Sequence, residues 1–214
     1  MFIYFCDSDP YKKTLTDDKN SVHSLAVLPS GYLASGSYRE IIIWDMSAKI
    51  DRILKGHRNV VSSLAVLPNG DLASGSWDKT IIIWNPKDGS IKRKLTGHTD
   101  SVYSVAVLPN GDLVSGSADK TITIWNTNDG SIKRNITGDT YDVYSLAVLP
   151  NGDLASGSGD NTITIWNTND GSIRRNLTGH TDTVNTLAIL PNGDLVSGSR
   201  DKTIIIWNPY NSCK

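Results

Sequence analysis

Residues Gly97–Asn126 read GHTDSVYSVAVLPNGDLVSGSADKTITIWN, and near-copies of this stretch fill most of the 214-residue chain. The tryptophan that closes the stretch recurs at spacings of 40, 41, 41 and 41 residues, and a Leu-Pro pair recurs in its middle. A period this regular indicates an array of one supersecondary unit, which fixes the architecture before any local structure is considered. The recurring residues are Trp44, Trp84, Trp125, Trp166 and Trp207, with Pro29, Pro68, Pro109, Pro150 and Pro191.

The composition suits many short strands and tight turns better than a helical core. Hydrophobic residues make up 38% of the chain and aromatic residues only 7%, while Thr, Ser, Gly and Asn are abundant. The net charge is −1 and the basic residues are scattered among acidic ones, so nucleic-acid binding through phosphate neutralisation has little support. Cys6 and Cys213, the only cysteines, are expected to be free thiols unless the two ends of the chain meet.

The apolar start, Phe2–Phe5, is too short for the core of a signal peptide or for a membrane span. We therefore expect a cytoplasmic protein that does not bind membranes, with residues 1–214 forming a single domain.

We expect the sequence to begin partway through a unit, because Phe2–Phe5 aligns with Ile81–Trp84 and Tyr11–Thr16 aligns with Ile91–Thr96. Residues 1–16 are this partial unit. The later units cover approximately residues 17–56, 57–97, 98–138, 139–179 and 180–207.

Each unit contains four strand signals. In the second unit they are separated by turn signals such as Pro68-Asn69-Gly70. Three of the strands are apolar, and the fourth alternates Lys and Arg with other residues, which protects an exposed sheet edge from pairing with other chains. The sequence predicts a four-stranded antiparallel sheet with strands at Val61–Leu67, Leu72–Ser76, Thr80–Trp84 and Ile91–Leu95.

These units resemble WD repeats, the four-stranded blades of WD β-propellers, over nearly the whole chain. The marks are Gly97-His98 before the first strand, Asp119 in the turn after the second and Trp125 at the end of the third. The resemblance implies an all-β propeller with five blades, closed when Tyr11–Thr16 pairs with the blade that ends at Trp207. Since WD propellers usually have seven blades, the sequence leaves open a fragment of a larger ring or oligomerisation that completes one.

The resemblance also implies a buried network in which the indole, hydroxyl, imidazole and carboxylate of one unit are hydrogen-bonded in series. The second Ser of each SGS (Ser76, Ser117, Ser199) has the same strand parity as the first, so the choice of Ser stays open. The expected sets are His57, Ser74, Asp78 and Trp84; His98, Ser115, Asp119 and Trp125; and His180, Ser197, Asp201 and Trp207.

A Ser-His-Asp set that recurs in three units argues against a hydrolytic triad, which needs one exposed cleft and an oxyanion hole. The four His lie in four different units without Cys or His at ligand spacing, so we expect no enzyme activity, metal or cofactor. Two units break the pattern. Asp139 replaces His and faces Asp160 in the fourth unit, while in the first unit Asp18 replaces His and Arg39 is its candidate partner.

Positions that differ between such similar units are candidates for partner binding, and the resemblance places them on the top face of the propeller. Aromatic side chains and Arg are enriched where proteins bind one another, although neutral drift at solvent positions is the alternative. The expected function is a scaffold that binds a protein or peptide loop. A small-ligand module for a sugar or phosphate in the central channel is the other reading, with Arg200 as its candidate residue. The predicted partner-binding residues are Tyr38, Trp77, Arg200, His23, Tyr103, Tyr144, Asn185 and Asp142.

Overall fold

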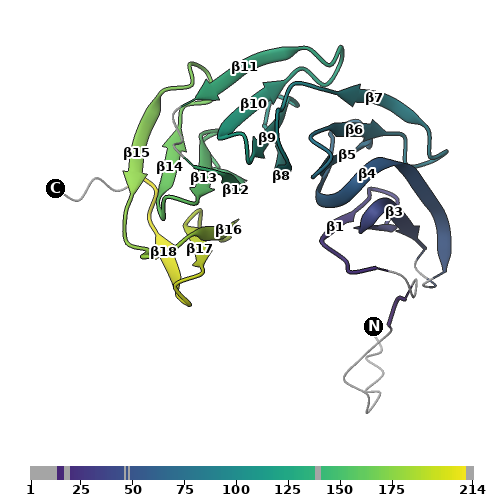
Figure 1. Ribbon diagram of the computed structural model, residues 1–214, viewed down its shortest axis with the longest axis horizontal. Coiled ribbons are helices and arrows are strands. Elements are labelled where there is room, and N and C mark those ends of the chain that lie inside the picture. The colour runs from purple at the N-terminus through teal and green to yellow at the C-terminus, as the bar shows by residue number, and fades with distance from the viewer. Residues whose placement is uncertain (1–13, 17–19, 46, 48, 138–140, 211–214) are drawn as a thin grey trace, which may run out of the picture.

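The computed structural model describes residues 14–16, 20–45, 47, 49–137 and 141–210. This part of the chain is all β and contains no helix, as the composition predicts. Its strands form antiparallel sheets arranged around an open arc (Figure 1). The strands are β1 (Ser24–Val27), β2 (Leu33–Gly36), β3 (Tyr38–Trp44), β4 (Ile50–Val66), β5 (Leu72–Ser76), β6 (Ile81–Trp84), β7 (Ile91–Leu95), β8 (Val102–Val107), β9 (Leu113–Ser117), β10 (Thr121–Trp125), β11 (Ile132–Thr137), β12 (Val143–Val148), β13 (Leu154–Ser158), β14 (Ile163–Trp166), β15 (Ile173–Leu177), β16 (Val184–Ile189), β17 (Leu195–Ser199) and β18 (Ile204–Trp207).

The four-stranded antiparallel sheet expected for each unit is present in β8–β11 and in β12–β15. Strands β5, β6 and β7 match the strands expected in the second unit to within one residue at each end. Each sheet is a meander, because every strand pairs with the one that precedes it in the chain. The last sheet, β16–β18, has three strands.

The first seven strands form one sheet, although the sequence predicts two separate ones. The reason is β4, whose first half pairs with β3 and whose second half pairs with β5. The turn after β2 is one residue shorter than in the other repeats, so β3 starts at Tyr38 and reaches Val60 of β4. Strand β4 therefore continues without a break from the outer edge of the first repeat to the inner edge of the second.

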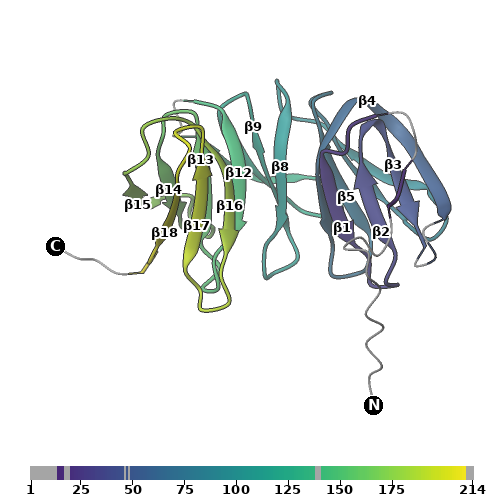
Figure 2. The ribbon, with the colours of Figure 1, turned by 90° about the horizontal axis from the view of Figure 1, so that it is seen from below.

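The expected closure of the ring is not formed in the described residues. Strand β18 pairs only with β17, and Thr14–Thr16 carries no strand, while Tyr11–Lys13 lies outside the described part of the chain. The first and last repeats stand at the two ends of the arc, with an opening between them (Figures 1 and 2). The other expectations for the chain ends, at Phe2–Phe5, Cys6 and Cys213, also fall outside the described residues.

The hydrophobic core lies between neighbouring repeats, in four clusters that each combine two of them. In one cluster, Ala73, Ile81 and Ile83 of the second repeat pack against Val102 and Val105 of the third. The first strands of successive repeats, including β8, β12 and β16, contact one another along the inner side of the arc (Figure 1). Side chains on neighbouring first strands therefore lie close together, although their residues are about one repeat apart in the sequence.

Candidate protein-interaction surface

A hydrogen-bonded chain of four side chains links the strands within the second repeat. The imidazole of His57 lies with Nδ1 2.9 Å from Asp78 Oδ2 and Nε2 2.7 Å from Ser74 Oγ. The indole Nε1–H of Trp84 donates to the same Ser74 oxygen at 2.8 Å. A neutral His57 with its proton on Nδ1 donates to the carboxylate and accepts from the hydroxyl, so every polar group in the chain has a partner.

The third and fifth repeats contain the same arrangement, with the His-to-Asp and His-to-Ser distances between 2.6 and 2.8 Å. Their tryptophans donate to the Ser oxygen at 2.8 Å. The structure therefore brings together all three sets expected from the sequence. These sets are His57, Ser74, Asp78 and Trp84; His98, Ser115, Asp119 and Trp125; and His180, Ser197, Asp201 and Trp207.

The first Ser of each SGS belongs to the network, which settles the choice that the sequence leaves open. The second Ser has a different partner: Ser76 Oγ accepts from the backbone N–H of Asp78 at 3.0 Å, and Ser117 and Ser199 do the same for Asp119 and Asp201. The second Ser thus stabilises the turn that carries the Asp, while the first Ser accepts a hydrogen bond from the indole and donates one to the imidazole.

Burial alone would raise the pKa of the Asp78 carboxyl. Hydrogen bonds from His57, from Thr80 and from the backbone N–H of Arg58 outweigh this effect and hold the pKa well below its ordinary value. Burial lowers the pKa of the His98 imidazole, against the charge and hydrogen bond of Asp119, which raise it. The pKa of its partner Asp119, which burial alone would raise, is held below its ordinary value by hydrogen bonds from Thr121 and from the backbone N–H of Thr99. In the third repeat, both shifts favour a carboxylate beside a neutral imidazole near neutral pH.

These sets are not accessible to a substrate. Ser74, Ser115 and Ser197 are all 0% exposed, and each Ser oxygen already receives the indole N–H. A nucleophilic hydroxyl must instead reach a substrate in an open cleft. The arrangement stabilises the second, third and fifth repeats, and its buried serines are not placed to act as nucleophiles.

The fourth and first repeats lack the imidazole, and the two acidic residues at its position, Asp139 and Asp18, lie outside the described residues. The hydrogen bond between Trp and Ser remains in both repeats, since Trp166 Nε1 donates to Ser156 and Trp44 Nε1 donates to Ser35, both at 2.8 Å. In the first repeat, the suggested partner of Asp18, Arg39, donates from Nε to the backbone carbonyl of Arg58 at 3.1 Å.

A row of aromatic rings crosses four repeats: His23, Trp77, Tyr103 and Tyr144, hereafter the aromatic row. Neighbouring ring centroids lie 6.1, 6.4 and 5.0 Å apart along the row. Trp77 meets Tyr103 edge-on at 90°, and Tyr103 stacks on Tyr144 at 18°. Both are favourable arrangements of aromatic rings.

The rings of the row come from two kinds of position in the repeat, the start of the first strand and the turn after the second strand. Tyr103 and Tyr144 are the second residues of β8 and β12, which lie side by side, so their rings meet across the repeat boundary. Trp77 stands in the turn after β5, where its backbone N–H donates to the Val60 carbonyl at 3.0 Å. Trp77 remains 39% exposed, which leaves ring surface available to a partner.

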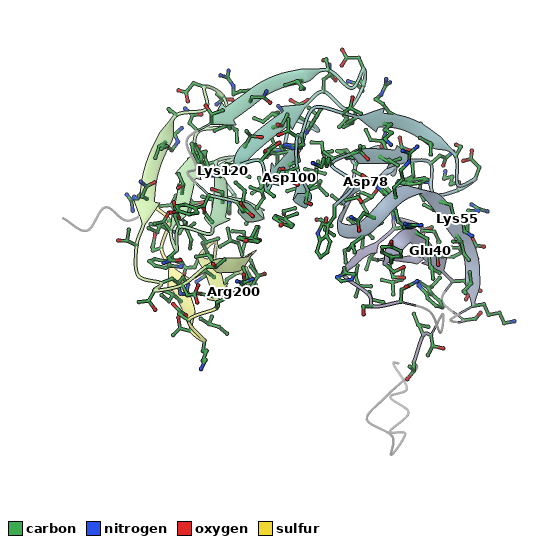
Figure 3. All side chains as sticks on the ribbon, viewed as in Figure 1. Glu40, Lys55, Asp78, Asp100, Lys120 and Arg200 are labelled. Atoms are coloured by element: carbon green, nitrogen blue, oxygen red, sulfur yellow. The ribbon has the colours of Figure 1, made fainter. Side chains whose placement is uncertain are left out.

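Two carboxylates and a guanidinium surround the tyrosines. Burial, then the negative charges of Asp142 and Asp100, raise the pKa of Tyr103. Burial and Asp142 raise the pKa of Tyr144, and the positive charge of Arg200 opposes them. Asp142 also accepts a long hydrogen bond, 3.4 Å, from the Tyr144 hydroxyl. Figure 3 shows Asp100 and Arg200, which come from the third and fifth repeats.

Six of the eight predicted partner-binding residues belong to this surface. Four of them form the aromatic row itself, and the charges of Asp142 and Arg200 act on its tyrosines. Asn185 is exposed at the equivalent position of β16. Tyr38 differs, because it lies in β3 opposite Val60, and its ring contacts the Arg39 guanidinium at 4.7 Å. In the described residues no ring contact joins Tyr38 to the row.

Sequence reasoning missed Asp100, whose position also varies between repeats, as Asn20, Asn59, Asp100, Tyr141 and Asp182. That variation between repeats was the feature of the sequence that could have identified Asp100 as a candidate for partner binding. Lys79 lies near it, with Nζ 3.8 Å from Asp100 Oδ1 and 2.8 Å from the Thr99 carbonyl.

Two cavities lie on other parts of the surface. One, of about 660 Å³, is lined by the proline turns of the first two repeats together with Arg52 and Lys92. The other, of about 310 Å³, lies beside Asp153 and Arg174. Neither is lined by the aromatic row or by Arg200.

No cluster of three or more His, Cys, Asp or Glu side chains that could hold a metal ion occurs in the described part of the chain. In the same residues, no helix is long and apolar enough to cross a membrane.

Comparison with known proteins gives one family. A search of curated proteins returned no match. The family model described as WD domain, G-beta repeat matches the chain four times in succession, at residues 48–85, 89–126, 130–167 and 171–208. Residues 17–47, the part of the first repeat that contains the shortened turn, lie outside the matched ranges. Together the matches cover more than half of the sequence, and the chain therefore belongs to the WD40 family.

Proposed function

We propose that this protein is a non-catalytic interaction scaffold that binds a peptide or a protein loop across the aromatic row. WD40 repeats generally mediate protein–protein interaction, which supports the class of function. The observation that carries the proposal is the continuous contact of the four rings, which come from four different repeats. A row of this kind offers partners a rigid surface rather than isolated side chains.

The charges beside the row favour a partner segment with a lysine or arginine. Asp142 and Asp100 act together on Tyr103, and the neighbouring ring of Trp77, which contacts Tyr103, remains 39% exposed. A cation placed over an aromatic face is attracted to its electrons, and a nearby carboxylate strengthens that attraction. Arg200, at the Tyr144 end, suits an acidic group further along the same segment.

The proposal includes five WD-type blades and a cytoplasmic location. The support for five blades is the pairing of β4. Its first half pairs with β3 of the first repeat, and its second half pairs with β5 of the second repeat. The cytoplasmic location stays a prediction from the sequence. No observation favours the small-ligand alternative, because neither cavity described above includes Arg200.

The test is selection of short linear peptides from a displayed library on the purified protein. The selected peptides should be enriched in Lys or Arg, and replacing Trp77 and Tyr103 together by Ala should abolish their binding while the melting temperature stays within a few degrees. Tyr38→Ala is the matched control, since Tyr38 is an exposed tyrosine outside the row. Binding that survives the double replacement, or that is lost equally in the control, would contradict the assignment.

A further inference from the structure

Each junction between repeats joins two complementary faces. A trailing face, carried by the earlier repeat, presents residues such as Ala155, Ile163 and Ile165 in the fourth repeat. A leading face, carried by the later repeat, presents residues such as Val184 and Leu195 in the fifth. The same two faces meet in the other three core clusters.

A valine of the later repeat packs against a glycine of the earlier repeat at each of the four junctions. A Cβ added at Gly157 would lie 2.8 Å from Val184 Cγ1, so only glycine leaves room for that valine. The pairs Gly36 with Val61, Gly75 with Val102 and Gly116 with Val143 show the same contact, at 2.6 to 2.8 Å. The four valines are 0% exposed.

The trailing face of the last repeat is uncovered by the described residues. Ile204 and Ile206, which correspond to Ile163 and Ile165, are 75% and 63% exposed, against 0% and 2% for their counterparts. A Cβ added at Gly198 would meet only Thr186 Cγ2, from its own repeat. Among the described residues, no valine fills the position beside Gly198 that a valine fills beside the other four glycines.

The leading face of the first repeat is uncovered in the same way. Val22, the counterpart of Val61, Val102, Val143 and Val184, is 58% exposed. Leu25 and Val27 beside it are 60% and 71% exposed. Figures 1 and 2 show β1 and β18 at opposite ends of the arc.

We propose that the trailing face of one copy of this protein binds the leading face of a second copy. The surfaces are those that already meet at four junctions, with Gly198 as the open position, Val22 as its valine and Ile204 and Ile206 as the apolar wall. A hydrogen bond repeats as well. Leu187 N–H donates to Ser145 Oγ across the last junction, and Leu25 and Thr186 hold the corresponding positions at the two ends.

This contact joins different surfaces on the two copies, so it is head-to-tail, and it leaves a free face at each end of every dimer. Contacts of this kind build rings or open chains, with a mass that rises with protein concentration. The inference goes beyond the proposed function and does not rest on it, because none of these residues belongs to the aromatic row.

The experiment compares the native protein with Val22→Lys and Ile204→Lys by sedimentation over a range of concentrations. The native protein should form species heavier than its 23.3 kDa, and each variant alone should stay at 23.3 kDa. An equal mixture of the two variants should form a species of twice that mass, because the intact trailing face of the first fits the intact leading face of the second. Ile173→Lys is the control, since Ile173 is a 50% exposed isoleucine on an outer strand, and it should associate like the native protein.

Three results would overturn the proposal. A native protein that is monomeric at every concentration would show that no second copy covers these faces. Association of Val22→Lys alone would show a symmetric contact between trailing faces. A mixture of variants that stays monomeric would show that the two faces do not bind each other. Near-ultraviolet circular dichroism should be unchanged in all variants, because the replaced side chains are exposed.

Discussion

The rings of Tyr103 and Tyr144 stack with their centroids 5.0 Å apart, although 41 residues separate them in the chain. The contact exists because β8 and β12 run side by side and carry these residues at the same position. Repetition of one unit therefore makes a continuous surface from residues that are distant in sequence. A surface built this way depends on how neighbouring repeats pack against each other as well as on the identity of each residue.

Replacing Asp142 by Asn should lower the pKa of the Tyr103 and Tyr144 phenols, because the Asp142 charge disfavours both phenolates. The pKa values should stay above the ordinary 10.0, since burial is the larger cause and is unchanged. Ultraviolet absorbance of tyrosinate during an alkaline titration measures the shift. An unchanged titration curve would mean that Asp142 does not act on the row.

Ser115→Ala should lower the free energy of unfolding by about 1–3 kcal/mol, because it leaves the buried Trp125 indole N–H and His98 Nε2 without a partner. Denaturation by urea gives this value. Ser131→Ala is the matched control, since its hydroxyl bonds only to Asp129 at the surface, and it should change stability by about 0.5 kcal/mol or less. Equal effects in the two variants would show that the buried chain contributes nothing special.

Acidification should destabilise the protein in two steps. The pKa of His98 lies below its ordinary 6.5 in the folded state, so its contribution is present above pH 6.5 and is lost as the pH falls below that value. The pKa of Asp119 lies below its ordinary 3.8, so a further contribution is lost below about pH 3.8. Nuclear magnetic resonance of the His98 ring during titration, assigned with His98→Gln, tests the first step. A midpoint above 6.5 would contradict it.

Much of the architecture could be predicted from the sequence, because one unit is written several times and its strands, turns and closing tryptophan recur together. The four members of the network could be identified for the same reason. The choice between Ser74 and Ser76 could not, since both point to the same side of β5. The sequence offers no measure of which hydroxyl lies nearer to the indole.

Relations between repeats were harder to predict. The continuous β4 follows from one missing residue before Arg39, and its effect appears only when β3 reaches Val60. Tyr38 was grouped with Trp77 by alignment, yet the same missing residue moved it into a strand.

Asp139→His should raise the melting temperature, because it would supply in the fourth repeat the imidazole that pairs with Asp78 in the second repeat and with Asp119 in the third. In the second and third repeats the imidazole joins the carboxylate to the Ser hydroxyl, whereas two acidic residues at these positions repel each other. Calorimetry measures the change, and Asp139→Asn separates removal of the charge from gain of the imidazole. A melting temperature below that of the native protein would refute the prediction.

Gly157→Ala and Gly198→Ala form a matched pair that tests the junctions. At Gly157 the new Cβ would lie 2.8 Å from Val184 Cγ1 and 3.1 Å from its carbonyl oxygen, so the two repeats must move apart, at a cost of about 1–3 kcal/mol in the free energy of unfolding. At Gly198 the Cβ would meet only the Thr186 methyl group, on a side chain that can turn away, and stability should change by less than about 1 kcal/mol.

Gly198→Ala should weaken the association between copies without lowering stability, because the added methyl group occupies the position proposed for Val22 of another copy. Urea denaturation and sedimentation on the same samples separate the two effects. Equal losses of stability would show that Gly198 is already covered, and unimpaired association of Gly198→Ala would show that Val22 does not dock there.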